Sequence, residues 1–199
     1  MRELPREPDT RGLRAVRSEE NEVALLARIE QGDREAFAQL YRAYFSRLAR
    51  FLDRMTRSPA VIEEVINDTM LVVWQKAATF NHTCKVSTWI FGIAYRKALK
   101  AVASMDEPEE ADADDEPGCD AAQPEVALSL HQLQQQVARA LDCLPPTQRA
   151  VVNLAYYHGM GYEEIAGIMD CPVNTVKTRM FSARSRLRAL LGSDLEVNT

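Results

Sequence analysis

Long apolar runs are absent from this sequence of 199 residues. Apolar side chains make up 46% of it, but they recur in short groups, far from the ~20 consecutive residues that a membrane-crossing helix takes. The N-terminal stretch over residues 1–20 is charged and contains Pro5 and Pro8. It has no apolar core followed by a small-residue cleavage site, so it does not resemble a secretory signal. These absences predict a cytoplasmic protein.

Metal-binding motifs are also absent. The four cysteines and three histidines include no CxxC pair and no zinc-like spacing: Cys84, Cys119, Cys143, Cys171, His82, His131 and His158. A zinc site needs three or four converging ligands, and nothing near His82 and Cys84 supplies the others. We therefore expect no metal and no cofactor, and we expect the cysteines to be reduced structural thiols.

Basic residues are absent from one stretch of the chain. The net charge is −5, but residues 104–125 contain ten acidic side chains and no basic one. Without those ten, 24 Lys and Arg stand against 19 Asp and Glu, a net charge of +5. The sequence is therefore a basic protein with an acidic insert, and this distribution permits a nucleic-acid partner.

The same acidic stretch divides the chain. It holds three prolines, one glycine and few apolar residues other than alanine, so it cannot bury enough surface to offset the entropy of ordering. On both sides of it apolar residues recur three and four apart, without sustained strand-like alternation. We predict an all-α fold of two small helical domains joined by a flexible acidic linker. The predicted parts are an N-terminal extension over 1–20, a helical bundle over 21–103, the linker over 104–127, a helix-turn-helix domain over 128–192 and a tail over 193–199.

Four helices are predicted in each domain. In the first domain, the first helix begins at about Glu20 and the second just after an N-cap at Asp33. The third begins near Pro59 and the fourth at about Trp89. In the second domain they run through Leu130–Leu141, through Val151–Ala155, over Tyr162–Met169 and over about Val173–Leu191. The last two are separated by the tight turn Asp170-Cys171-Pro172, which is helix-turn-helix spacing.

The last predicted helix has two different faces. Apolar residues share one stripe that would pack on the domain: Val176, Met180, Ala183, Leu187 and Leu190. The opposite face is polar with one aromatic residue, and the span from Pro172 to Gly192 holds five basic residues and no acidic one. Flanking cations suit phosphates, and Asn, Thr and Ser suit base edges. This helix is therefore predicted to lie in the major groove of DNA.

The segment from Tyr162 to Arg184 resembles the promoter −35 reading segment of extracytoplasmic-function sigma factors, the smallest branch of the bacterial sigma-70 family. Three shorter segments resemble the other conserved domain of that family: Gly32–Phe37 its opening, Glu63–Thr69 its polymerase-binding helix and Ser87–Ile90 the helix that recognises the −10 element. The resemblance covers residues 21–102 and 128–191, in the order of that family.

The resemblance implies a subunit that binds core RNA polymerase, directs it to −35 and −10 elements and stabilises the melted strand, without covalent chemistry of its own. The expected partners are the β′ coiled coil and β flap of the polymerase, duplex and melted promoter DNA, and an anti-sigma factor. We expect no insertion into a membrane. The implied polymerase-binding residues are Glu63, Glu64 and Asp68.

The resemblance also divides the DNA contacts between the two domains. The −10 element would be read as a melted strand, with one base flipped into a pocket formed by the loop over 80–85. The implied −10 residues are Asn81, His82, Thr83, Lys85, Arg96, Lys97 and Lys100. The implied −35 residues are Asn174, Thr175, Lys177, Thr178, Arg179, Phe181, Ser182 and Arg184.

Two other functions compete with this interpretation. A helix-turn-helix regulator acting without polymerase would bind duplex DNA tightly alone, usually as a dimer on paired half-sites. An enzyme built on His82 and Cys84 is disfavoured, because no third group would orient the base and no glycine-rich phosphate loop is present. The acidic linker could mimic nucleic acid in the RNA exit path, or it could only repel and extend the chain, which is the favoured alternative.

Overall fold

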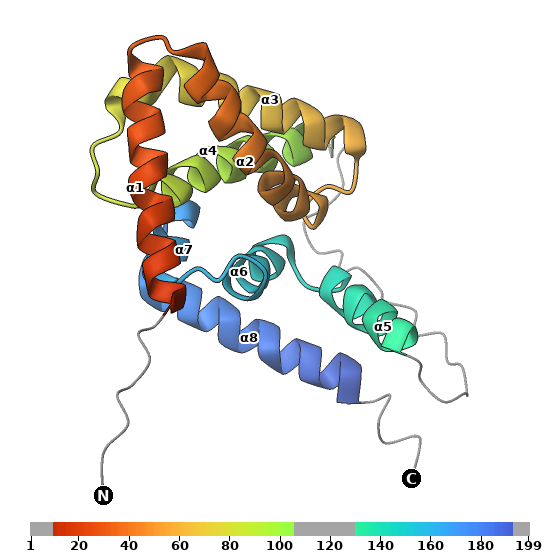
Figure 1. Cartoon of the computed structure of the whole chain (residues 1–199). Helices are drawn as coiled ribbons and strands as arrows, with labels where there is room; N and C mark the ends of the chain where they lie inside the picture. The colour runs from red at the N-terminus through yellow and green to blue at the C-terminus, as the bar shows by residue number, and fades with distance from the viewer. Residues whose placement is uncertain (1–9, 106–129, 193–199) are drawn as a thin grey trace, which may run out of the picture.

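The computed structural model of the protein describes residues 10–105 and 130–192. Within these ranges it contains eight α-helices and one 3-10 turn, without a strand, which confirms the predicted all-α fold. The elements are α1 (Thr10–Glu30), α2 (Arg34–Asp53), α3 (Pro59–Lys76), η1 (Ala77–Thr79), α4 (Val86–Met105), α5 (Leu130–Asp142), α6 (Pro146–Tyr156), α7 (Tyr162–Met169) and α8 (Val173–Gly192). We call α1 to α4 the N-terminal lobe and α5 to α8 the C-terminal lobe (Figure 1).

Helix α1 begins earlier than the sequence pattern predicted. It starts at Thr10, ten residues before the expected start near Glu20. The added residues, 10–19, include three arginines, which are good helix formers, but show no obvious apolar stripe. The predicted acidic linker and tail fall almost wholly on residues 106–129 and 193–199, outside the described part of the chain.

The start of α2 follows the predicted cap. Gly32 adopts a positive φ of 81° just after α1, and the Asp33 carboxylate then accepts hydrogen bonds from the backbone N–H groups of Glu35 (2.9 Å) and Ala36 (3.1 Å). The Ala36 N–H and the Arg28 side chain lower the pKa of Asp33. These groups fix the angle between α1 and α2.

Aromatic residues fill the core of the N-terminal lobe. The rings of Tyr44, Phe51 and Phe91 are fully buried, and the centroids of Phe51 and Phe91 lie 5.4 Å apart. The Tyr44 hydroxyl donates a hydrogen bond of 2.5 Å to the buried carboxylate of Glu22, which joins α2 to α1. A polar pair of this kind is tolerated in a core because both partners are satisfied.

The two lobes share one continuous apolar core, a contact that no sequence pattern predicted. Helix α7 packs on α4 (Figure 1), where a Cβ added at Gly92 would lie 3.8 Å from the Ile168 Cα, and one added at Gly167 would lie 3.5 Å from the Thr88 side chain. The imidazole of His158 lies against the rings of Phe51 and Phe91, which belong to the other lobe. The lobes therefore pack against each other as closely as elements within one domain.

The cysteines depart from the expectation of four reduced thiols. Cys84 and Cys171 are free, whereas Cys143 is disulfide-bonded. Cys119 lies outside the described residues. The expectation was wrong for Cys143, because wide spacing in sequence says little about distance in a folded chain.

None of the helices in the described part of the chain combines the length and the apolar character that a bilayer crossing requires.

Candidate nucleic-acid interface

A tight turn sets α8 at a fixed angle to α7. Glu164 accepts a hydrogen bond of 2.9 Å from the backbone N–H of Gly161 and so caps the start of α7. Asp170 ends α7 in the left-handed region (φ 50°), and the Cys171 N–H donates back to the carbonyl oxygen of Ala166 (3.1 Å). The chain resumes as a helix at Val173, so α7 and α8 form the predicted helix-turn-helix.

Helix α8 buries the stripe that its spacing predicted. Val176, Met180 and Ala183 are buried, and Leu187 packs on the same core. The opposite face is open, and Phe181 keeps 76% of its surface exposed. A large aromatic side chain in that position gains nothing from the core, so it is available to a partner such as a thymine methyl group.

The predicted −35 residues share this outer side of α8 but differ in how far their side chains are exposed to solvent. Five are exposed: Asn174, Lys177, Thr178, Phe181 and Arg184. Three are half-buried: Thr175, Arg179 and Ser182. Arg184 is held in place by Tyr156, because it donates a hydrogen bond of 2.8 Å to the Tyr156 hydroxyl and its guanidinium lies 5.9 Å from the ring centroid.

The loop between η1 and α4 presents the predicted −10 residues on an ordered turn. The Asn81 side chain accepts hydrogen bonds from the backbone N–H (3.2 Å) and hydroxyl (2.7 Å) of Thr83, which is an Asx turn. His82 has a positive φ of 58°, and its ring packs edge-on against buried Phe80. Three residues of the loop are exposed to solvent: Asn81, His82 and Thr83. Their polar atoms are therefore accessible, while buried Phe80 supports the loop from below.

Helix α1 anchors the far end of that loop. The Glu19 carboxylate accepts a hydrogen bond of 2.8 Å from the backbone N–H of Val86, the first residue of α4. The carboxylate therefore satisfies one of the N–H groups that a helix start leaves unpaired.

Burial, and then the charge of Glu19, raise the pKa of the Cys84 thiol, so this cysteine stays protonated at neutral pH.

The cations predicted for the −10 element divide into two kinds. Lys85 forms an ion pair of 2.9 Å with Glu164 of the C-terminal lobe, and this hydrogen bond raises the pKa of Lys85. Lys97 pairs at 2.7 Å with Asp68, which belongs to the predicted polymerase-binding set. Arg96 and Lys100 are exposed, so the structure separates two engaged cations from two that face solvent.

The predicted polymerase-binding acids lie on the exposed side of α3. Glu63, Glu64 and Asp68 are all exposed, and Leu71, one turn beyond Asp68, keeps 52% of its surface in solvent. Sequence reasoning missed Leu71, although its spacing of three from Asp68 places it on the same helical face. A single exposed leucine is common on protein surfaces, so Leu71 adds apolar area to this face without marking it as an interface by itself.

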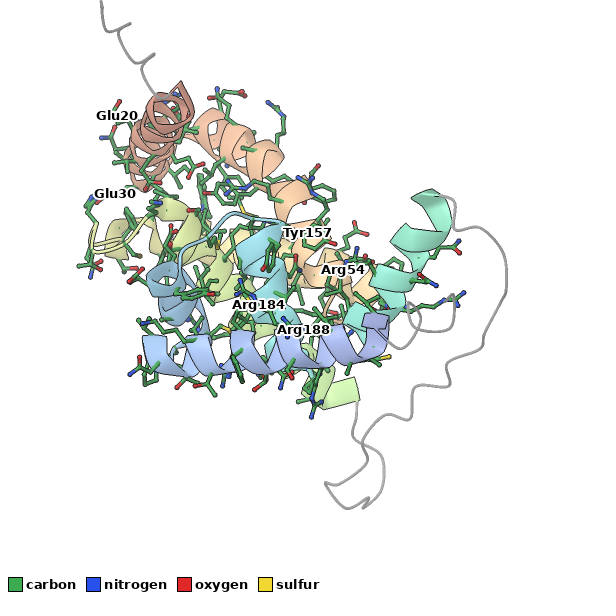
Figure 2. The ribbon with its side chains drawn as sticks, turned by 90° about the horizontal axis from the view of Figure 1, so that it is seen from below. Glu20, Glu30, Arg54, Tyr157, Arg184 and Arg188 are labelled. Carbon is green, nitrogen blue, oxygen red and sulfur yellow. The ribbon has the colours of Figure 1, made fainter. Side chains whose placement is uncertain are left out.

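A groove in the C-terminal lobe was also missed. It has a volume of about 450 Å³ between α5, α6 and α8 and is lined by Val137, Leu141, Val152, Tyr156, Tyr157, Arg184, Leu187 and Arg188. Figure 2 labels Tyr157, Arg184 and Arg188 there, with Arg54 of the N-terminal lobe, whose guanidinium lies 5.5 Å from the Tyr157 ring centroid. Tyr156 and Tyr157 stay exposed beside this groove, with 62% and 57% of their surface in solvent.

Among the residues that the structure describes, no three His, Cys, Asp or Glu side chains converge in a way that could hold a metal ion.

Comparison with known proteins matches both lobes. The family model described as Sigma-70 region 2 matches residues 40–106, and the model described as Sigma-70, region 4 matches residues 134–187. The chain is 32% identical over 175 residues to the ECF RNA polymerase sigma factor SigK of Mycolicibacterium vanbaalenii, covering 85% of this chain and 88% of that protein. It is 31% identical over 173 residues to the ECF RNA polymerase sigma-E factor of Escherichia coli strain K12, covering 82% and 90%.

Two solved structures share the fold. One is CnrH in complex with the cytosolic domain of CnrY, with a TM-score of 0.65 and 23% identity over 87% of this chain and 99% of that one. The other is the sigma factor RpoE in complex with the anti-sigma factor NepR from Bartonella quintana, with a TM-score of 0.55 and 26% identity over 79% and 98%.

Proposed function

Because this chain belongs to the extracytoplasmic-function (ECF) RNA polymerase sigma factors of the sigma-70 family, we propose that it binds core polymerase through α3 and reads promoter DNA through α8 and the 80–85 loop. The observation that carries the proposal is the presence of both surfaces on one chain. A polar, basic helix faces outward from the helix-turn-helix, and an acidic helix faces outward from the other lobe.

Helix α8 is proposed to read the −35 element in the major groove. Its exposed residues offer an amide, a hydroxyl and an ammonium group to base edges and phosphates, in Asn174, Thr178 and Lys177. Arg184 is pre-oriented by Tyr156, which reduces the entropy lost when the guanidinium binds a phosphate.

The loop after η1 is proposed to meet the melted −10 strand. Asn81, His82 and Thr83 present donors and acceptors to unpaired base edges, and Arg96 and Lys100 are exposed cations for the backbone. Lys85 and Lys97 can join them only by exchanging their ion pairs with Glu164 and Asp68. Exposed ion pairs are worth about 0–1 kcal/mol, so a phosphate competes easily with them.

We propose that two surfaces of the protein contact the polymerase, and that one class of regulatory protein acts on both surfaces. The acids of α3 suit basic residues of the β′ coiled coil, and Leu71 adds apolar area. The largely apolar groove between α5, α6 and α8, lined by Val137, Leu141 and Leu187, is proposed for the β flap. The likeness to RpoE bound to NepR supports an anti-sigma factor as the regulator. A subunit of this kind performs no covalent chemistry itself.

A run-off transcription assay with purified core polymerase tests the proposal. Addition of this protein should produce transcripts from specific promoters and none from DNA without them. Absence of both promoter-dependent transcript and polymerase binding would overturn it. Tight binding to duplex DNA by the protein alone, as a dimer, would favour the regulator that works without polymerase.

A further inference from the structure

Two adjacent tyrosines at the C-terminal end of α6 keep more than half of their surface in solvent, Tyr156 and Tyr157. The guanidinium carbon of Arg184, on α8, lies 5.9 Å from the centroid of the Tyr156 ring. The guanidinium carbon of Arg54, which follows α2, lies 5.5 Å from the centroid of the Tyr157 ring. Each lobe therefore supplies one cation to this pair of exposed aromatic rings.

The surface around the two tyrosines carries an excess of positive charge. Arg50 and Arg54 are four residues apart on one side of α2, and Arg188 lies one turn beyond Arg184 on α8. Figure 2 shows Arg54, Arg184 and Arg188 on the same side of the molecule as Tyr157. None of these four arginines forms an ion pair with a residue in the described parts of the chain.

The nearby carboxylates do not neutralise these arginines. Asp142, at the junction of the lobes, pairs with Arg57 and lies 3.9 Å from a guanidinium nitrogen of Arg149. Asp53 is next to Arg54 in the sequence, but adjacent residues of a helix do not face each other. Guanidinium groups hold phosphates through planar, bidentate hydrogen bonds, so this excess charge suits a polyanion of phosphates.

We propose that this surface binds single-stranded nucleic acid, with two neighbouring bases stacked on the tyrosine rings and the phosphates held by the arginines. We call it the tyrosine–arginine patch, and its residues are Arg50, Arg54, Tyr156, Tyr157, Arg184 and Arg188. The Cα atoms of two residues joined by a trans peptide are about 3.8 Å apart, so the two rings can serve neighbouring bases.

The two rings favour a single strand over other polyanions. In a duplex each base is covered on both faces by its neighbours, whereas a single strand offers base faces to aromatic side chains. An acidic peptide could bind the arginines, but its carboxylates offer no flat ring to stack on the tyrosines. The rings therefore decide between the two kinds of partner.

The proposal goes beyond promoter reading. Arg184 is the one patch residue among those expected to contact the −35 element. Four of the patch residues also line the groove proposed for the β flap: Tyr156, Tyr157, Arg184 and Arg188. A strand on the patch would therefore compete with polymerase for the free subunit. This consequence rests on the proposed function, whereas strand binding itself does not.

Strand binding is measured with the full chain alone, without polymerase or promoter. Fluorescence anisotropy follows labelled oligo(dT) and oligo(U) of about 12 nucleotides, titrated with wild type and with the patch variant Tyr157→Ala/Arg54→Gln. The matched control is Phe45→Ala/Arg42→Gln, which removes an exposed aromatic residue and an exposed arginine elsewhere on α2. Thermal melting checks that both double variants fold. The loop over 80–85, the other surface proposed for a single strand, is unchanged in all of them.

Wild type and the control should bind with equal affinity, and the patch variant roughly tenfold more weakly. Its salt dependence should fall by about 0.7, the contribution of one phosphate contact on a single strand. Tyr157→Phe keeps the ring and should bind like wild type. Tighter binding of oligo(U) or of oligo(dT) would identify RNA or DNA as the natural strand, and either result supports the proposal.

Three results would overturn the proposal. The first is an affinity of the patch variant equal to that of the control, and the second is the absence of strand binding by wild type. The third is displacement of the strand by polyglutamate as effectively as by unlabelled oligo(dT), because it would show that the arginines bind charge alone.

Discussion

The side-chain amide of Asn153, on α6, donates a hydrogen bond to the backbone carbonyl oxygen of Phe51, on α2 (Nδ2···O 3.2 Å). Phe51 lies in the last turn of α2, where carbonyl groups have no partner within the helix. Arg149 makes a parallel contact, donating to the carbonyl oxygen of Arg54 (3.3 Å). The C-terminal lobe therefore caps a helix of the N-terminal lobe, which ties the stability of one to the position of the other.

Replacement of Asn153 by Ala should loosen the contact between the lobes. Asn153 is buried, so its loss leaves the Phe51 carbonyl without a donor and should lower the free energy of unfolding by about 1–3 kcal/mol. Denaturant unfolding measures this, and small-angle scattering should show a larger radius of gyration. Asn21→Ala, at an exposed position on α1, is the control and should change neither quantity. Equal stabilities of the two variants would contradict the capping role.

His158 should make stability depend on pH. Burial against Phe51 and Phe91, with Arg47 and Arg50 adding repulsion, lowers the pKa of His158 from 6.5 to about 4. The unfolded chain takes up a proton below pH 6.5 that the folded chain refuses until about pH 4, so this contribution to stability is complete above 6.5 and declines as pH falls toward 4.

The comparison of wild type with His158→Leu isolates this effect from the titration of the acidic residues. The difference in unfolding free energy between the two proteins should shift by roughly 1–2 kcal/mol between pH 7 and pH 4, allowing for partial solvent exposure. Curves that stay parallel over that range would show that His158 does not titrate as its surroundings indicate.

The helices and the faces of α8 were predictable from sequence because each is a local property. The spacing of Val176, Met180 and Ala183 alone defines the buried stripe, and Asp33 caps α2 through its immediate neighbours. The packing of α7 on α4 was not predictable in this way. This packing depends on Gly92 and Gly167. In the sequence they indicate only interruptions of a helix, but in the fold they leave room for the close approach of Ile168 and Thr88.

The same contrast between local properties and long-range contacts applies to the candidate site. The exposure of Phe181 followed from the periodicity of α8, whereas the acids of α3 were named only through the family resemblance. The ion pairs Lys85–Glu164 and Lys97–Asp68 followed from neither, since each joins residues far apart in the chain.

Charge reversal on α3 should remove polymerase binding while the fold persists. Glu63, Glu64 and Asp68 are exposed, and the Lys97 pair that Asp68 would lose is worth about 0–1 kcal/mol. The triple replacement by Lys should weaken binding to core polymerase by roughly 100-fold or more, because attraction to basic residues becomes repulsion. Glu20→Lys, Glu35→Lys and Asp53→Lys together, at exposed acids of other helices, form the matched control. Equal affinity of both variants would refute the assignment of α3.

Two substitutions on α8 should separate base reading from phosphate binding. Phe181→Ala should leave the unfolding free energy within about 0.5 kcal/mol of wild type, because the ring is exposed. It should weaken binding of the holoenzyme only to −35 sequences that place a thymine against the ring.

Lys177→Ala should weaken binding of the holoenzyme to all −35 sequences by a similar factor, and it should reduce the salt dependence of binding by about one counterion. Fluorescence anisotropy over a series of −35 variants and salt concentrations measures both. Ser185→Ala, farther along the same exposed side, should match wild type, and an equal loss for Phe181→Ala on every sequence would show that the ring does not read a base.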